Sequence, residues 1–195
     1  MTETEIINVS SDLKHRIFPR PFERLSNLRN RKEGLTGVEI GVAAGEHALS
    51  LLETLDIKQL YLVDPYELYE EYSEGKAHYG VDQLPLSRIE LICREKLKAF
   101  DNKIVRIKKL SYEAVNLIGD KVDFVYIDGN HQEEFVIEDI ENYFPLLEES
   151  GVLGGHDFYN GFQREHDGVI SAVTNFIHNK KYQLRIETPD WWVET

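Results

Sequence analysis

Short apolar runs alternate with segments of helical periodicity along most of the chain, and this alternation limits the fold more than any single motif. The first run, TGVEIGV at residues 36–42, is followed by residues 45–55, where leucines recur on one helical face. Four more runs follow, at residues 59–64, 103–110, 122–128 and 151–157. Strands that alternate with amphipathic helices form βαβ units, so the sequence predicts an α/β fold with a mostly parallel, doubly wound sheet.

Two further apolar runs, residues 182–187 and 191–194, are separated only by Thr188, Pro189 and Asp190, a combination typical of turns. Because no helical segment lies between them, we expect them to close the sheet at one edge in antiparallel orientation. The predicted sheet therefore has seven strands. Residues 36–195 are expected to form this domain. Residues 1–35 are expected to form an N-terminal helical extension, with a basic stretch from Lys14 to Lys32.

The net charge of the protein limits the classes of partner that it can bind. A net charge of −13 repels phosphate backbones and argues against a nucleic-acid partner, whereas it favours cationic ligands and divalent metals. The single cysteine, Cys93, excludes an internal disulfide and fits a reducing compartment. The start of the sequence lacks signal-peptide features, and no apolar run approaches membrane-spanning length. We therefore expect a cytoplasmic protein with no membrane partner.

Polar and small residues gather just after the predicted strands. In parallel sheets ligands bind outside the carboxyl ends of the strands, so these positions form the expected site. The residues there are Gly41 to Gly45, Asp64, Ser111, Asp128 to His131, His156 and Asp157. Their coincidence at one edge of the sheet is stronger evidence for a ligand site than any of them alone.

The loop VEIGVAAGEH carries Gly41 and Gly45 with small residues between them, which lets a ligand approach the backbone closely. A tight strand-to-helix turn would explain the same glycines. Asp64 ends the second strand and could accept both hydroxyls of a ribose, or it could cap the helix that follows. The loop lacks the third glycine of a dinucleotide fingerprint and the lysine of a phosphate-binding loop.

Three motifs, VEIGVAAGEH, LYLVDPYE and VDFVYIDGNH, resemble those of the class I S-adenosylmethionine-dependent methyltransferases. The resemblance implies a Rossmann-like sheet and an S-adenosylmethionine cofactor. The residues that it implies for cofactor binding are Glu39, Gly41, Gly45, Asp64, Ser111 and Asp128. The cofactor is a sulfonium cation without phosphates, which suits an acidic protein whose loop has no phosphate-binding lysine.

Asp128 and Asp157 end neighbouring predicted strands, and two carboxylates that meet repel each other unless a cation or a proton intervenes. A divalent metal resolves this repulsion. The segments YIDGNH and GGHDF resemble the metal-binding segments of small divalent-metal O-methyltransferases of the catechol and antibiotic-sugar types. The resemblance implies a metal site, Mg²⁺ or Mn²⁺, with Asp128 and Asp157 as ligands. His156 stands where that branch usually offers an oxygen ligand, and it is expected either as the third ligand or, facing away from the metal, as a base. A histidine ligand favours softer ions than magnesium.

His131 follows Asp128 by three residues, and we expect it to act as the catalytic base that removes the acceptor proton. Alternatively, His131 could have a purely structural role, as a histidine at the start of a helix that bonds to a backbone group. His156 is the other candidate base. Residues 66–85 could form a lid or a solvated surface excursion. Residues 158–168 could line the acceptor pocket, or they could be a plain loop and helix cap.

The predicted function is therefore metal-assisted methyl transfer to a hydroxyl of a small-molecule acceptor. A metal-independent N- or O-methyltransferase, a nicotinamide-dependent oxidoreductase and a non-catalytic nucleoside-binding module remain as alternatives. The sequence leaves the acceptor and homo-oligomerisation open.

Overall fold

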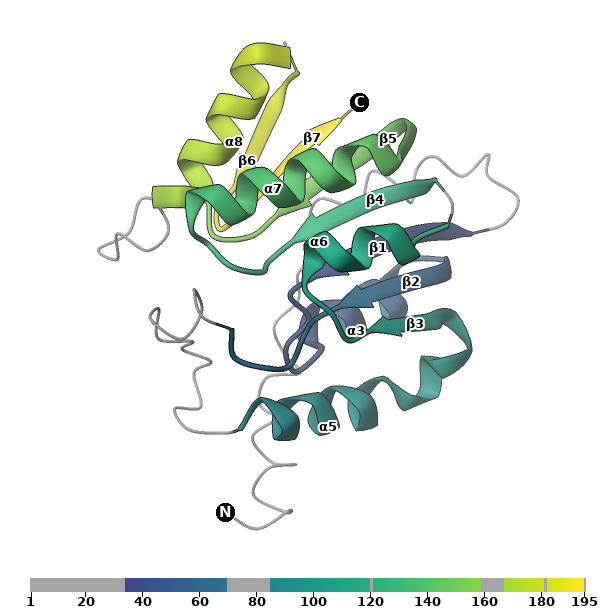
Figure 1. The fold of residues 1–195 in the computed structure, drawn as a ribbon. Helices are drawn as coiled ribbons and strands as arrows, with labels where there is room; N and C mark the ends of the chain where they lie inside the picture. The colour runs from purple at the N-terminus through teal and green to yellow at the C-terminus, as the bar shows by residue number, and fades with distance from the viewer. Residues whose placement is uncertain (1–33, 70–84, 120, 159–166, 181, 195) are drawn as a thin grey trace.

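Seven strands form one sheet in the order β3-β2-β1-β4-β5-β7-β6 (Figure 1). This computed structural model describes residues 34–69, 85–119, 121–158, 167–180 and 182–194. The strands are Leu35–Ile40 (β1), Ile57–Val63 (β2), Ile104–Ile107 (β3), Val122–Ile127 (β4), Leu147–Gly155 (β5), Leu184–Glu187 (β6) and Asp190–Glu194 (β7). Strands β1 to β5 pair in parallel, and β7 runs antiparallel to both β5 and β6. The predicted seven-stranded, mostly parallel sheet with an antiparallel closing strand is confirmed.

Helices cover both faces of the sheet (Figure 1). They are α3 (Glu46–Thr54), α5 (Leu86–Leu97), α6 (Ser111–Ala114), α7 (Glu133–Tyr143) and α8 (Asp167–Lys180). Short 3₁₀ segments occupy Lys98–Lys103, Val115–Leu117 and Phe144–Leu146. On one face, Val38 and Ile40 of β1 belong to a core that includes buried residues of α6, α7 and α8. On the other face, α3 and α5 bury their apolar residues against the sheet.

Strand β5 differs from its sequence-based prediction, because it begins at Leu147 rather than at Gly151. Leu147 pairs with Val122, and the register then shifts before Val152 pairs with Phe124. Ser150 has a φ of 65°, in the left-handed region that few non-glycine residues adopt. Residues 148–150 are polar, and polar residues are typical of loops, so the sequence pattern does not indicate this irregular beginning of β5.

Several predicted features lie outside the described residues. They include nearly all of the helical extension at residues 1–35, most of the lid segment at residues 66–85, and residues 159–166 of the expected acceptor-pocket segment. Within the described part of the chain, no helix combines the length and apolar character needed to cross a bilayer.

Candidate active site

The parallel ladder continues one residue beyond several strands and fixes the site residues by backbone hydrogen bonds. Gly41 N donates to Val63 O at 2.9 Å, and Asp64 N donates to Ile107 O at 3.2 Å. On the other side of β1, Asp128 N donates to Ile40 O at 2.8 Å. Because these bonds belong to the sheet, the positions of the site residues are set by the strand order.

The loop after β1 approaches the loop after β4 very closely at Gly41. Gly41 has a φ of 80°, and a Cβ atom built on it would lie 2.0 Å from the carbonyl oxygen of Asp128. Only glycine fits this contact. Gly45, whose φ is also 80°, serves a different neighbour, because a Cβ there would lie 3.0 Å from Cys93 Sγ of α5.

The carboxylate of Asp64 holds the glycine loop. Its Oδ2 atom accepts hydrogen bonds from the backbone N–H groups of Val42, at 3.0 Å, and Ala43, at 2.9 Å. Its Oδ1 atom accepts the N–H of Tyr66 at 2.8 Å. Burial raises the pKa of Asp64, and these three hydrogen bonds partly offset that shift. A carboxylate offers about four acceptor directions, so little capacity remains for a second partner.

Tyr66 also stabilises the glycine loop, through a hydrogen bond from its side chain. Its hydroxyl donates to the carbonyl oxygen of Ala43 at 2.8 Å, and its φ of 48° turns the chain sharply after Asp64 and Pro65. Burial raises the pKa of its phenol far above the usual value, so the hydroxyl keeps its proton as a donor. Asp64 and Tyr66 together define the shape of the loop.

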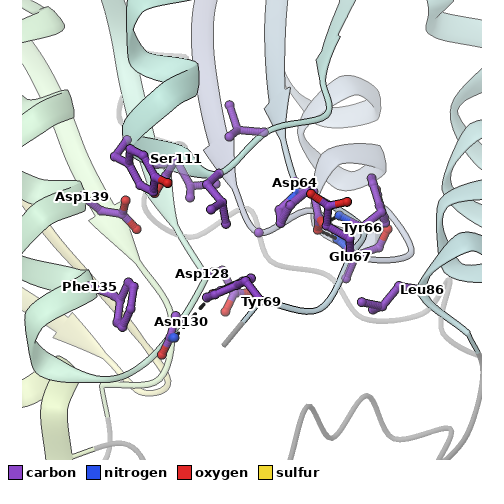
Figure 2. Close-up of a pocket in the computed structure, with 18 of the residues that line it drawn as sticks. Asp64, Tyr66, Glu67, Tyr69, Leu86, Ser111, Asp128, Asn130, Phe135 and Asp139 are labelled. Atoms are coloured by element: carbon purple, nitrogen blue, oxygen red, sulfur yellow. Dashed lines mark hydrogen bonds between the residues drawn. The ribbon is translucent and has the colours of Figure 1, made fainter. Parts of the chain in front are cut away.

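A cavity of about 210 Å³ opens at this edge of the sheet (Figure 2). Four of the predicted cofactor residues line it: Gly41, Asp64, Ser111 and Asp128. Further along the wall, the Asn130 amide donates to the Tyr69 hydroxyl at 3.4 Å. Two of the predicted residues, Glu39 and Gly45, are not part of the lining.

Glu39 lies on the α3 face of β1, and only 1% of its surface is exposed. Its Oε2 atom is 3.4 Å from His47 Nδ1, and the His47 ring stacks on Tyr126 with centroids 3.8 Å apart. Burial raises the pKa of Glu39, although the neighbouring His47 opposes this. Glu39 is therefore buried beside His47 and does not form part of the cavity wall.

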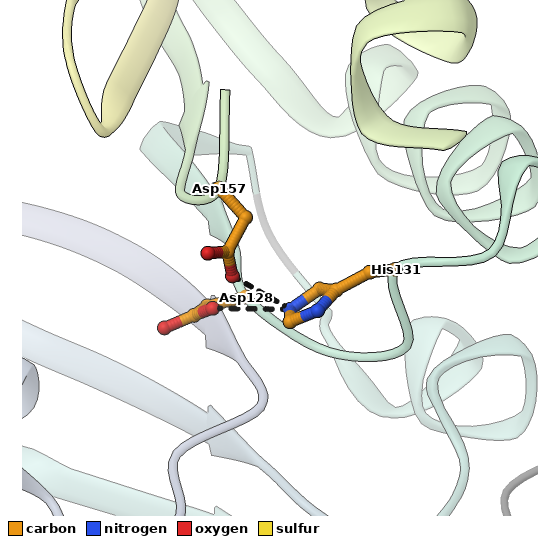
Figure 3. Close-up of side chains that lie close together, drawn as sticks. All are labelled: Asp128, His131 and Asp157. Atoms are coloured by element: carbon orange, nitrogen blue, oxygen red, sulfur yellow. Dashed lines mark ion pairs between the residues drawn. The ribbon is translucent and has the colours of Figure 1, made fainter. Parts of the chain in front are cut away.

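Beside the cavity, two aspartates and two histidines form what we call the acid–histidine cluster: Asp128, His131, His156 and Asp157. His131 Nε2 lies 2.9 Å from Asp157 Oδ2 and 3.6 Å from Asp128 Oδ1 (Figure 3). His156 Nδ1 lies 3.3 Å from Asp157 Oδ2 and 3.9 Å from Asp128 Oδ1. The predicted convergence of the two aspartates is therefore present in the structure.

The charges of this cluster are strongly coupled. Burial alone would lower the pKa of His131, but hydrogen bonds and charge from Asp128 and Asp157 outweigh it and raise the pKa to about 10. The same competition raises the pKa of His156. Burial would raise the pKa of Asp157, yet hydrogen bonds from both histidines hold it far below its usual range.

The cluster also has the donor set of a metal site. Asp128, His131 and Asp157 each offer one ligand atom, and these atoms all lie within 4.8 Å of one another. His131 thus stands among the potential ligands, although the sequence suggested His156 for that place. Asp157 has a φ of 60°, and Phe158 N donates to Pro189 O at 2.9 Å, which holds this turn against the closing strands.

Asp139 is a cavity residue that sequence reasoning missed. It lies on α7 and is buried together with Val136, Ile140 and Tyr143 on the face that packs on the sheet. A carboxylate on the apolar face of an amphipathic helix was the available signal, because such a group is costly to bury without a function or a partner.

Residues 38–158 match the family described as "Methyltransferase domain", and this match covers more than half of the chain. The chain belongs to this methyltransferase family. The prediction from the three motifs is thus confirmed at the level of family. The protein R132 of Acanthamoeba polyphaga mimivirus, described as uncharacterized, is 24% identical over 176 residues, which cover 87% of this chain and 72% of R132.

Solved structures show the same fold at low sequence identity. Cofactor-bound Rv0187 from MTB superposes with a TM-score of 0.66 at 11% identity, covering 98% of this chain and 88% of its own. An O-methyltransferase from Bacillus cereus in complex with SAH has a TM-score of 0.61 at 13% identity, covering 98% and 90%. The class I methyltransferase fold is therefore established for this protein.

Proposed function

We propose that the protein transfers a methyl group from S-adenosylmethionine to a hydroxyl group of a small molecule, assisted by a divalent metal. The observation that carries this proposal is the position of Asp128, which lines the cavity and also belongs to the acid–histidine cluster. A ligand that fills the cavity would therefore end beside groups able to bind an acceptor oxygen. The family match and the SAH-bound structural neighbour support the same reaction.

The cavity suits S-adenosylmethionine. Among the described residues its lining contains no lysine or arginine, which fits a ligand without phosphates, while Asp64, Glu67 and Asp128 suit hydroxyl groups and a positive charge. We propose that Gly41 and Gly45 shape the methionine end, Asp64 and the neighbouring Glu67 face the ribose, and Ser111 flanks the adenine. When bound, the cofactor supplies an electrophilic methyl group on a positively charged sulfur.

The acid–histidine cluster fits a divalent cation, because two carboxylates and imidazole nitrogens suit manganese, iron or zinc as well as magnesium. We propose Asp128, Asp157 and His156 as the ligands. When bound, the ion would lower the pKa of an acceptor hydroxyl and fix its oxygen.

We propose His131 as the base. Its side chain is 32% exposed, against 21% for His156, although its Nε2 atom is itself buried between the two aspartates. Without a cation, the two aspartates hold a proton on His131, whose Nε2 atom faces both of them. A cation on Asp128 and Asp157 would replace that proton, and the neutral Nε2 atom could then take the proton of the acceptor hydroxyl. The bound cofactor would supply the methyl group: the acceptor oxygen would gain the new C–O bond as the S–C bond breaks, which would give a methyl ether and S-adenosylhomocysteine.

Calorimetric titration tests the proposal. S-adenosylhomocysteine should bind the wild-type protein, and Mn²⁺ should then bind the loaded protein with one site. Asp157→Asn should keep the first binding event and lose most of the second. Methylation of a panel of small hydroxyl compounds should stop with a chelator and return with one divalent ion. Absence of S-adenosylhomocysteine binding would refute the proposed function as a whole.

A metal-independent methyltransferase is the second candidate, and one observation favours it. His131 already lies between Asp128 and Asp157, and its raised pKa means that a protonated imidazole balances their charge. This candidate predicts that methyl transfer continues unchanged in the presence of the chelator.

A further inference from the structure

Asp139 is a buried carboxyl group at the cavity that the proposed reaction does not use. It lies on α7 with only 3% of its surface exposed, and it contributes to the cavity wall. Figure 2 shows its carboxylate projecting from the helix towards the cavity, near Ser111. The acid–histidine cluster does not include it.

The environment of Asp139 leaves its hydrogen-bonding capacity incomplete. Ser111 donates a hydrogen bond to it, and its Oδ2 atom lies beside Gly129. Its buried Oδ1 atom has no hydrogen-bond partner within the described part of the chain. A buried acceptor without a donor costs about 1–3 kcal/mol, and burial also raises the pKa of Asp139 to about 7. A ligand that supplies a donor would remove this cost.

The residues around Asp139 indicate which part of a ligand it meets. Ser111, which bonds to Asp139, follows β3 and lines the cavity together with its neighbours Leu110 and Tyr112. Phe135, which also lines the cavity, lies one turn earlier on α7. Apolar and aromatic side chains beside a single acidic acceptor suit a flat heterocycle that carries an amino group. They do not suit a hydroxyl-rich sugar, which needs several polar partners.

We propose that Asp139 recognises the exocyclic amino group of the cofactor's adenine and so makes the protein selective for adenine over other purines. The inference rests on the proposed function, because it assumes that the nucleoside of S-adenosylmethionine occupies the cavity. A carboxylate accepts hydrogen bonds, so it pairs with the amino group of adenine. Hypoxanthine has a carbonyl oxygen at that position, which would face the lone pairs of Asp139 and leave both acceptors unpaired.

Binding of two ligands tests this assignment: S-adenosylhomocysteine and its inosine analogue, S-inosylhomocysteine. At about pH 8.5, where Asp139 with its pKa of about 7 is ionised and only accepts hydrogen bonds, the wild-type protein should bind the adenosine compound roughly 10- to 100-fold more tightly. Asp139→Asn should reduce this preference to about threefold or less, because the amide can also donate to a carbonyl oxygen. Glu141→Gln makes the same chemical change at an exposed position of α7 and should leave both affinities unchanged.

The outcomes separate the residue from the function. If the wild-type protein shows no preference, or if Asp139→Asn keeps the full preference, the assignment of Asp139 is overturned while the proposed function stands. If the wild-type protein binds neither compound, the proposed function itself fails. Asp139→Ala, which has no acceptor, serves as a second variant if Asp139→Asn does not fold, and it should lose the preference as well.

Discussion

Asp64, which directly follows β2, is hydrogen-bonded to Ala43 in the loop that follows β1. Asp64 Oδ2 accepts the Ala43 N–H at 2.9 Å, while the Ala43 carbonyl accepts the hydroxyl of Tyr66, two residues beyond Asp64. The acid that ends β2 therefore shapes the loop that follows β1. Any ribose contact of Asp64 is made with the small acceptor capacity that this arrangement leaves.

Asp64→Asn should weaken S-adenosylhomocysteine binding by about tenfold or more and lower the melting temperature. The amide keeps the size of the side chain but turns one acceptor into a donor, so at least one of the backbone N–H groups of Val42, Ala43 and Tyr66 loses its acceptor. Calorimetry and thermal unfolding measure both effects. Asp56→Asn, at an exposed carboxylate before β2, is the control, and equal behaviour of the two variants would contradict the proposed role of Asp64.

Gly41→Ala should destabilise the protein by about 2 kcal/mol or more and abolish cofactor binding. The new Cβ atom would meet the Asp128 carbonyl at 2.0 Å, and the φ of 80° adds strain. Chemical denaturation measures the loss. Gly119→Ala is a matched control, since a Cβ there meets nothing within 4 Å. A Gly41→Ala variant as stable as Gly119→Ala would show that the loop contact is absent in solution.

Gly168→Ala should impair catalysis more than cofactor binding. A Cβ atom at Gly168 of α8 would lie 2.4 Å from the carbonyl oxygen of His131 and 2.7 Å from Glu133 N. Either the backbone at His131 or the first turn of α8 must therefore shift, while the contact involves none of the cavity residues Gly41, Asp64 and Ser111. We expect kcat to fall about tenfold or more with S-adenosylhomocysteine affinity changed little. Parallel losses of both quantities would argue against this local effect.

The stability difference between Asp139→Asn and the wild-type protein should depend on pH. The folded pKa of Asp139, about 7, lies above its usual 3.8, so the folded state binds the proton more tightly. The carboxyl group therefore lowers the free energy of unfolding as pH rises from about 4 to 7, by about 1.4 kcal/mol per pH unit at most. Ser111 opposes this shift through its hydrogen bond, and the charge of Glu138 adds to it.

Denaturant unfolding at pH 5, 6, 7 and 8 measures this effect. The Asn variant should gain stability relative to the wild-type protein as pH rises, and the gain should level off above pH 7. Glu141→Gln should show no such trend, because that carboxylate is exposed. A stability difference that does not change with pH would mean that folding does not raise the pKa of Asp139.

His131→Ala and His156→Ala should separate the two histidine roles. With His131 as base, its loss should lower kcat by about 100-fold or more while Mn²⁺ affinity is retained. With His156 as ligand, its loss should weaken Mn²⁺ binding by about 10-fold or more. Calorimetry and steady-state kinetics give the two readouts. The reverse pattern would assign the ligand role to His131, whose Nε2 atom the structure also places among the potential ligands.

The sequence predicted the fold well because its signals are local. Apolar runs and helical periodicity identified every strand, and the rule about strand ends brought Gly41, Asp64 and Asp128 to one edge. The beginning of β5 was missed, because residues 148–150 are polar and their pairing depends on β4.

The details of the site were harder to predict, because they depend on contacts between distant segments. The sequence shows that Asp64 ends a strand. It does not show that the Asp64 carboxylate accepts hydrogen bonds from Val42 and Ala43, which lie 22 and 21 residues earlier in the chain. The sequence places Glu39 in β1, but it does not show which face of the sheet the Glu39 side chain occupies. For Asp139, helical periodicity alone would have predicted burial, and only the structure adds the cavity.

The left-handed backbone at Asp157 restricts how this site can change over evolution. Aspartate, asparagine and glycine tolerate a φ near 60°, whereas most other side chains do not. A descendant that lost the proposed cation site could therefore replace this acid most easily by asparagine or glycine, and an alanine would carry a backbone penalty as well. Lineages that have lost the acid should thus retain a turn-compatible residue as the trace of it.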